Sequence, residues 1–200
     1  MKQKSRLIER LRLDALTDGV FAVAMTLLVM DLKLPEHFNP AGGEQLLAAL
    51  WELRTQFFVY IISFIVLGLR WMSLAKLASE HEKATDPYVH WALLHLFLIT
   101  CIPFSTMVVG RYGGLSPAIV LYASNTLLAA LVAARMAGIV APEVGDEDAH
   151  ERRIGLVAVV VVSLLVLVVS FVRPRYAMSI YLLNLFAPAL RYFWPLPKRK

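Results

Sequence analysis

The segment from Gly155 to Val172 is eighteen residues long, carries no charged side chain and contains nine valines. So many valines favour a buried strand, but a lone strand in lipid leaves its backbone hydrogen-bonding groups without partners. A helix pairs these groups internally, and about 20 helical residues cross the hydrocarbon core of a bilayer. The segment therefore predicts a membrane-spanning helix.

Further windows of about this length lie between charged or Pro- and Gly-rich breaks along the whole chain. The six expected spans are 13–32, 46–69, 89–109, 115–138, 154–172 and 176–194. Composition agrees, because 58% of the 200 residues are apolar and 18% are charged, whereas soluble domains average about 45–50% and about 25%. We therefore expect an all-α membrane protein with six transmembrane helices in a single domain, residues 1–200.

Some windows carry local signals. Glu52 and Arg54 fall in the first turns of the second window, so its membrane core is expected to begin near Gln56. Pro103 and Pro188 are expected to kink their helices. The connections are expected to be loops, at 33–45, 70–88 and 139–153.

The distribution of basic residues predicts the orientation. With a cytoplasmic N-terminus, only five of the twenty Lys and Arg fall outside: Lys33, Arg54, Arg111, Arg173 and Arg175. The positive-inside rule then places both termini in the cytoplasm and explains the net charge of +5 without a nucleic-acid partner. No cleavable signal is expected, and the single cysteine excludes a disulfide framework or a multi-cysteine metal site.

The first window contains an acidic residue inside the expected membrane region. An aspartate at a helix centre costs about 2.5–3.5 kcal/mol, so Asp18 needs a reason to lie there. One reason is structural: Asp18, with Thr17, ties the helix to a neighbour or pairs with Arg12. The other is functional: Asp18 is a ligand for an ion or a proton.

The same helix has an apolar stripe on a different face. At about 100° per residue, Val23, Leu27 and Met30 share one narrow stripe bordered by Thr26, whereas Asp18 lies about 140° from Val23. Ordinary contact with lipid or with another helix explains such a stripe when nothing else is known.

The segment from Arg12 to Asp31 resembles a known signature. It reads RLDALTDGVFAVAMTLLVMD, similar to R-x-x-x-F-S-D-G-x-x-A-I-A-x-T-L-L-V-L-D of the transmembrane protein 175 family, potassium channels of bacteria, archaea and animal endosomes and lysosomes. Two further patterns of that family, S-F…W and P-F-x-T, are matched by Ser63-Phe64 with Trp71 and by Pro103-Phe104-x-Thr106. The chain departs from the family at Leu16 (usually Phe), Thr17 (Ser), Val23 (Ile) and Met30 (Leu), and it lacks the histidines often found after Trp71.

The resemblance implies a single-repeat prokaryotic channel of the plasma membrane, a homotetramer whose first helices line a central pore. Carried over, Val23, Leu27 and Met30 form stacked apolar rings, and Thr26 a ring of hydroxyls; such rings gate by dewetting and select weakly. The resemblance further implies that Arg12, Thr17 and Asp18 brace the pore helix. Asp31 at the outer mouth either concentrates cations or is a solvated helix end.

Two other classes of function stay open. A proton-coupled secondary transporter would use Asp18 and His95, although isolated polar residues such as His95, Asn125 and Asn184 more often form interhelical hydrogen bonds. A membrane-embedded enzyme lacks support, because no nucleophile–base pair, metal-ligand spacing or phosphate loop is visible. The resemblance therefore implies a K⁺-permeable channel, and no enzymatic activity, metal or cofactor is expected.

Overall fold

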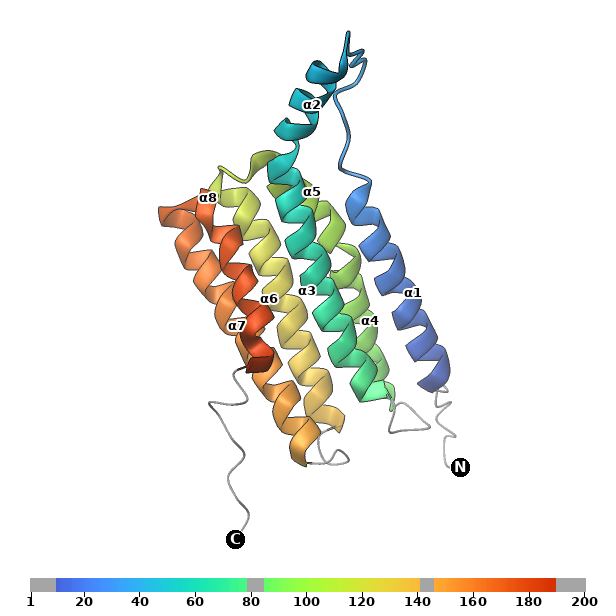
Figure 1. Cartoon of the computed structure of the whole chain (residues 1–200). Coiled ribbons are helices and arrows are strands. Elements are labelled where there is room, and N and C mark those ends of the chain that lie inside the picture. Colours follow the sequence, from blue (N-terminus) through green and yellow to red (C-terminus); the bar gives the residue numbers. More distant parts are fainter. Residues whose placement is uncertain (1–9, 79–84, 141–145, 190–200) are drawn as a thin grey trace, which may run out of the picture.

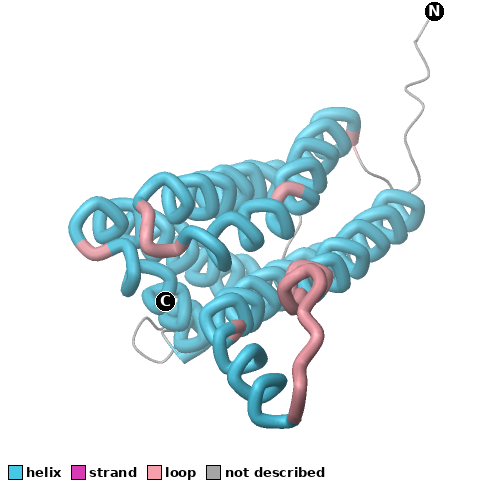
Figure 2. Tube along the Cα trace, turned by 90° about the horizontal axis from the view of Figure 1, so that it is seen from above, coloured by secondary structure: helices cyan, strands magenta, loops and turns pink. Residues whose placement is uncertain are grey.

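The computed structural model describes residues 10–78, 85–140 and 146–189, and every regular element in these ranges is helical (Figures 1 and 2). The elements are α1 (Arg10–Val29), α2 (Gly43–Glu52), α3 (Arg54–Ala78), α4 (Asp86–Thr100), α5 (Ile102–Tyr112), α6 (Ser116–Val140), α7 (Asp146–Val172), α8 (Pro174–Ala177) and the 3-10 helix η2 (Met178–Ala189). Five segments are long and apolar enough to cross a membrane: Arg10–Asp31, Arg54–Ala75, Asp86–Tyr112, Ser116–Ile139 and Gly155–Val172. The all-α membrane class predicted from the sequence is confirmed.

The second expected window is split in two. Helix α2 ends at Glu52 and α3 begins at Arg54, close to the expected start of the membrane core. The guanidinium of Arg54 donates to the carbonyl oxygen of Trp51 at 3.2 Å and lies over the Trp51 ring. This contact satisfies a carbonyl at the end of α2, so the helix can stop there.

The third window is also interrupted, at Cys101 between α4 and α5. Pro103 lies in the first turn of α5 and has no backbone N–H for the helical ladder, which explains the expected kink. The two halves still form one apolar segment of 27 residues.

Two of the expected loops are shorter than the sequence suggested. Helix α3 continues to Ala78, and α7 already begins at Asp146. In the sixth window, the short α8 is followed by η2, which contains Pro188 and ends at Ala189; residues 190–194 lie outside the described residues. The sixth transmembrane helix therefore stays a prediction.

The helices form one bundle in which α6 packs against α4, α5 and α7. Helix α1 packs against α3, α4 and α5 and lies at one edge of the bundle (Figure 1). Phe21, Ala24 and Leu28 on α1 are buried in the main apolar core. Only one face of α1 is thus used to hold it in the bundle.

Candidate functional site

The opposite face of α1 is apolar and uncovered. Val23, Leu27 and Met30, the stripe predicted from helical periodicity, are 57%, 49% and 60% exposed. Phe21 and Leu28, which point into the bundle, are 1% and 2% exposed. The stripe is thus free to contact lipid, another copy of the chain or a water-filled space.

Thr26 borders this stripe and is also exposed. Its hydroxyl donates to the carbonyl oxygen of Val23, in the preceding turn of the same helix, at 2.9 Å. The hydroxyl hydrogen is therefore engaged, and the oxygen lone pairs stay available on the exposed side.

Asp31, just after α1, is paired within the chain. Its Oδ1 accepts a hydrogen bond from Nη2 of Arg111 on α5 at 2.7 Å, and the Asp31 side chain is only 18% exposed. The sequence left two predictions open for Asp31: a free carboxylate that attracts cations, or a solvated helix end. The structure shows an ion pair that offsets the charge and ties the end of α1 to the end of α5.

In the middle of α1, Asp18 is bound to a neighbouring helix. Its Oδ1 accepts a hydrogen bond from Nε1 of Trp71 on α3 at 2.8 Å. Thr17 donates to the carbonyl oxygen of Leu13 at 2.9 Å, inside α1 itself. Arg12, the partner expected for Asp18, is exposed and makes no hydrogen bond or ion pair within the described ranges.

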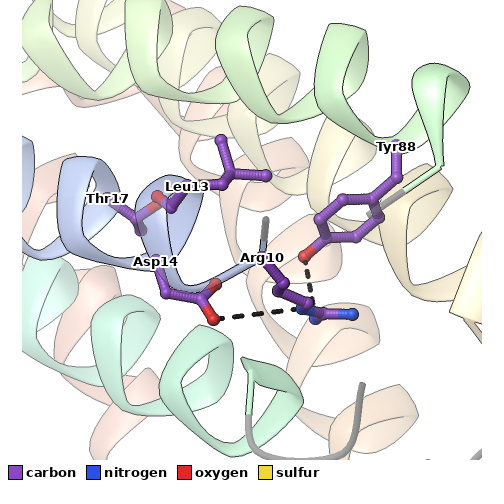
Figure 3. Close-up of polar contacts among 5 residues, drawn as sticks. All are labelled: Arg10, Leu13, Asp14, Thr17 and Tyr88. Carbon is purple, nitrogen blue, oxygen red and sulfur yellow. Dashed lines mark hydrogen bonds and ion pairs between the residues drawn. The ribbon is translucent and has the colours of Figure 1, made fainter. Parts of the chain in front are cut away.

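Arg10, and not Arg12, is the buried arginine of this region. Figure 3 shows the Arg10 side chain between Asp14 and Tyr88. Its Nη2 donates to the hydroxyl of Tyr88 on α4 at 3.4 Å, and its guanidinium lies 4.8 Å from the centre of the Tyr88 ring. Its Nε lies 4.0 Å from a carboxylate oxygen of Asp14. Sequence reasoning missed these three residues, although Arg10 and Asp14 have the i,i+4 spacing of a helical ion pair.

A pocket of about 180 Å³ opens beside these groups, between α1, α3, α4 and α6. Asp18 and His95, which the transporter hypothesis requires together, both line it. His95 is fully buried, stacks against Phe21 and lies beside the main chain of Ala129. The remaining lining residues are Leu13, Asp14, Thr17, Trp71, Leu74, Ala75, Tyr88, Ala92, Leu96 and Met136.

The two motif segments of the second and third windows meet in the core. The hydroxyl of Thr106 on α5 donates to the hydroxyl oxygen of Ser63 on α3 at 2.9 Å, and both residues are buried. Within the described residues, no group of three or more His, Cys, Asp or Glu side chains is arranged to hold a metal ion.

Comparison with known proteins gives consistent similarities over the first half of the chain. The family model described as endosomal/lysosomal potassium channel TMEM175 matches residues 12–103. A potassium channel of Streptomyces collinus is 32% identical over 101 residues, which are 50% of this chain and 48% of that protein. A potassium channel of Chamaesiphon minutus is 31% identical over 103 residues, 50% of this chain and 49% of that protein. The matched segment thus spans about half the length of these curated relatives.

Solved structures extend the similarity to most of the chain. The crystal structure of a lysosomal potassium-selective channel TMEM175 homolog from Chamaesiphon minutus matches with a TM-score of 0.75 and 25% identity, covering 91% of this chain and 97% of that one. A variant of the potassium channel MtTMEM175, in complex with a nanobody fusion protein, matches with a TM-score of 0.57 at 18% identity, covering 98% and 90%. The second match supports the fold alone.

Proposed function

Because residues 12–103 match the TMEM175 family model and most of the chain matches a solved TMEM175 homolog, we propose that it is a potassium-permeable cation channel of this family that mediates passive K⁺ flux. We place it in a prokaryotic plasma membrane as a homotetramer of six-helix subunits with both termini cytoplasmic. In this proposal the first helices of four subunits surround the pore. No catalytic group, metal or cofactor takes part, and K⁺ is the permeant ion.

The observation that carries the proposal is the exposed stripe of α1. Val23, Leu27 and Met30 face away from the bundle, within the segment that matches the family. Four copies around an axis would stack three apolar rings, a constriction that closes by dewetting. Thr26 would add a ring of hydroxyl oxygens to replace part of the water that an ion sheds.

Two polar contacts of α1 with neighbouring helices support a fixed pore helix. Asp18 in the middle of α1 is held by Trp71 on α3, and Asp31 just after α1 by Arg111 on α5, so two contacts anchor α1 to its own subunit. Thr17 and Asp18 act as bracing residues in this proposal. Arg12 is exposed and would brace the helix through a neighbouring subunit.

Flux into liposomes tests the proposal. We expect purified protein to pass K⁺, and Val23→Ala and Leu27→Ala to raise the flux and lower the K⁺/Na⁺ ratio, because smaller side chains widen and wet the constriction. Val168→Ala is the matched control, since Val168 is 65% exposed on α7 and distant from α1 in sequence and contact. Absence of K⁺ flux, or unchanged flux and selectivity in both α1 variants, would refute the pore assignment.

A proton-coupled transporter is the second candidate, favoured by the pocket that Asp18 and His95 share. It predicts saturable solute uptake driven by a proton gradient. Asp18→Asn and His95→Gln would each abolish that uptake, whereas a channel would give non-saturating K⁺ flux.

A further inference from the structure

The reversal between α7 and α8 carries two arginines at a membrane boundary. Arg173 directly follows the apolar span Gly155–Val172, and Arg175 lies in α8. Both residues are exposed. Neither side chain makes a hydrogen bond or an ion pair with any other residue that the structure describes. Their two positive charges are therefore available to a partner outside the chain.

Other arginines at this end of the bundle are engaged within the chain. Nη2 of Arg111 lies 2.7 Å from Oδ1 of Asp31, and the guanidinium of Arg54 lies 5.7 Å from the centre of the Trp51 ring. These contacts leave the reversal between α7 and α8 as a separate patch of positive charge.

The backbone of the reversal is held in place on both sides. The N–H of Tyr176 donates to the carbonyl oxygen of Arg173 at 3.1 Å. The hydroxyl of Ser116 on α6 donates to the carbonyl oxygen of Ser170 at 2.7 Å, and Ala177 is buried in the main core. A ligand that binds here meets a backbone that is already ordered, so little entropy is lost on binding.

Large apolar side chains flank the two arginines. Phe171 and Val172, the last residues of the span, are each 74% exposed, and Tyr176 is 66% exposed. The first two lie where acyl chains meet the protein, and a tyrosine just beyond a span is typical of the membrane–water interface. The reversal lies at the edge of the bundle away from α1 (Figure 1). A suitable ligand thus has an apolar part beside a negative group.

The depth of the two arginines decides the chemistry of that group. Lipid phosphates lie just outside the hydrocarbon core, where residues that directly follow a span are found. A guanidinium binds phosphate oxygens through two parallel hydrogen bonds. A zwitterionic lipid carries its own cation, which weakens the attraction. We propose that Arg173 and Arg175, flanked by Phe171, Val172 and Tyr176, bind the headgroup of an anionic phospholipid such as phosphatidylglycerol.

This site does not depend on ion conduction, so its first test is the melting temperature of the purified full-length protein in a neutral detergent. Phosphatidylglycerol should raise the melting temperature by about 3–5 °C more than an equal amount of phosphatidylcholine, since a ligand of the folded state stabilises it. Inorganic phosphate should give no such rise, because it has no acyl chains to cover the apolar side chains.

The double variant Arg173→Gln/Arg175→Gln should weaken phosphatidylglycerol binding roughly 25-fold, since each basic residue beside anionic lipid changes the affinity roughly five-fold. Arg173→Lys/Arg175→Lys keeps the charge and should retain most of the binding. Lys33→Gln is the matched control: it removes a single exposed charge at the same end of the bundle, on the loop after α1, and should leave the response unchanged.

Native mass spectrometry provides a second readout, because bound lipid adds its mass to the protein. Equal stabilisation by the two lipids, or a phosphatidylglycerol response that persists unchanged in Arg173→Gln/Arg175→Gln, would overturn the proposal. An equal rise with inorganic phosphate would overturn the lipid as the ligand. A protein that passes no K⁺ but retains phosphatidylglycerol through these arginines would refute the channel function and leave the lipid site standing.

Discussion

Asp31 and Arg111 illustrate how one contact changes the electrostatics of a whole site. A free aspartate at the pore mouth would attract cations in every subunit, but Nη2 of Arg111 lies 2.7 Å from its Oδ1. Because the two opposite charges are so close, their electrostatic potentials nearly cancel at the position of an approaching ion. The pair therefore anchors α1 more than it attracts K⁺.

Removal of the Arg111 guanidinium should leave the negative charge of Asp31 uncompensated. In Arg111→Gln we expect K⁺ flux at about 10 mM salt to rise roughly two-fold, and the gain to vanish near 1 M salt, where screening acts over about 3 Å. The measurement is liposome flux as a function of ionic strength. Adding Asp31→Asn to this variant should cancel the gain, and a gain that survives high salt would show that the pair acts on helix position instead.

Asp18 shows what sequence reasoning reaches at the level of a residue. The energetic argument that a membrane aspartate needs a partner predicts a structural tie, and the structure contains one. The partner is Trp71 and not Arg12, because the choice depends on which helices pack together, and 53 residues separate the two. Arg10, Asp14 and Tyr88 were missed for the same reason: Tyr88 lies on a helix 78 residues away.

The interruption between α4 and α5 lies next to an interhelical hydrogen bond. The carbonyl oxygen of Leu98 accepts from the backbone N–H of Cys101 at 3.3 Å and also from Nδ2 of Asn125 on α6 at 3.1 Å. The interhelical role expected for Asn125 is thus observed.

Asn125→Ala should destabilise this junction. Interhelical hydrogen bonds in membranes contribute about 0.6–2 kcal/mol, and we expect the melting temperature to fall by about 2–4 °C. Ser124→Ala is the control, since Ser124 makes no side-chain hydrogen bond within the described residues. An equal loss in both variants would mean that packing, not the contact with Leu98, explains the effect.

At the scale of elements, periodicity and hydropathy succeed and fail for physical reasons. A period of 3.6 places Val23, Leu27 and Met30 on one face, and the exposure of all three agrees with it. Hydropathy averaged over a window locates an apolar segment but does not register a local end such as the one at Leu53. At that end the backbone N–H of Leu53 donates to the carbonyl oxygens of Leu50 and Trp51, and the Arg54 side chain donates to that of Trp51.

For the whole molecule, the uncovered face of α1 predicts self-association. Native mass spectrometry should give four times the 22.4 kDa mass of one chain. In a Cys101→Ser background, Leu27→Cys should form disulfide-linked dimers on mild oxidation, because the proposed tetramer would bring four copies of this position together around its axis. Val168→Cys, at a position that is also exposed but lies on α7, should stay uncrosslinked, and equal crosslinking of both would contradict a pore lined by α1.

The arrangement of subunits and the contacts of buried Arg70 lie beyond what one sequence predicts. The guanidinium of Arg70 on α3 donates to the main-chain carbonyl oxygen of Thr126 on α6, and only the fold brings these two positions together. No spacing rule connects such positions, whereas the length and composition of each span follow directly from bilayer thickness.

The hydrogen bond from Thr26 to the carbonyl oxygen of Val23 has a consequence for the sign of the ions that pass. With its hydrogen directed back into the helix, each threonine presents electron density and no donor to the space beyond α1. Four such residues around an axis would solvate a cation as water oxygens do, whereas a halide would meet only repulsive lone pairs. The hydrogen bond that fixes the Thr26 side chain would thus make the ring of hydroxyl oxygens favour cations over anions.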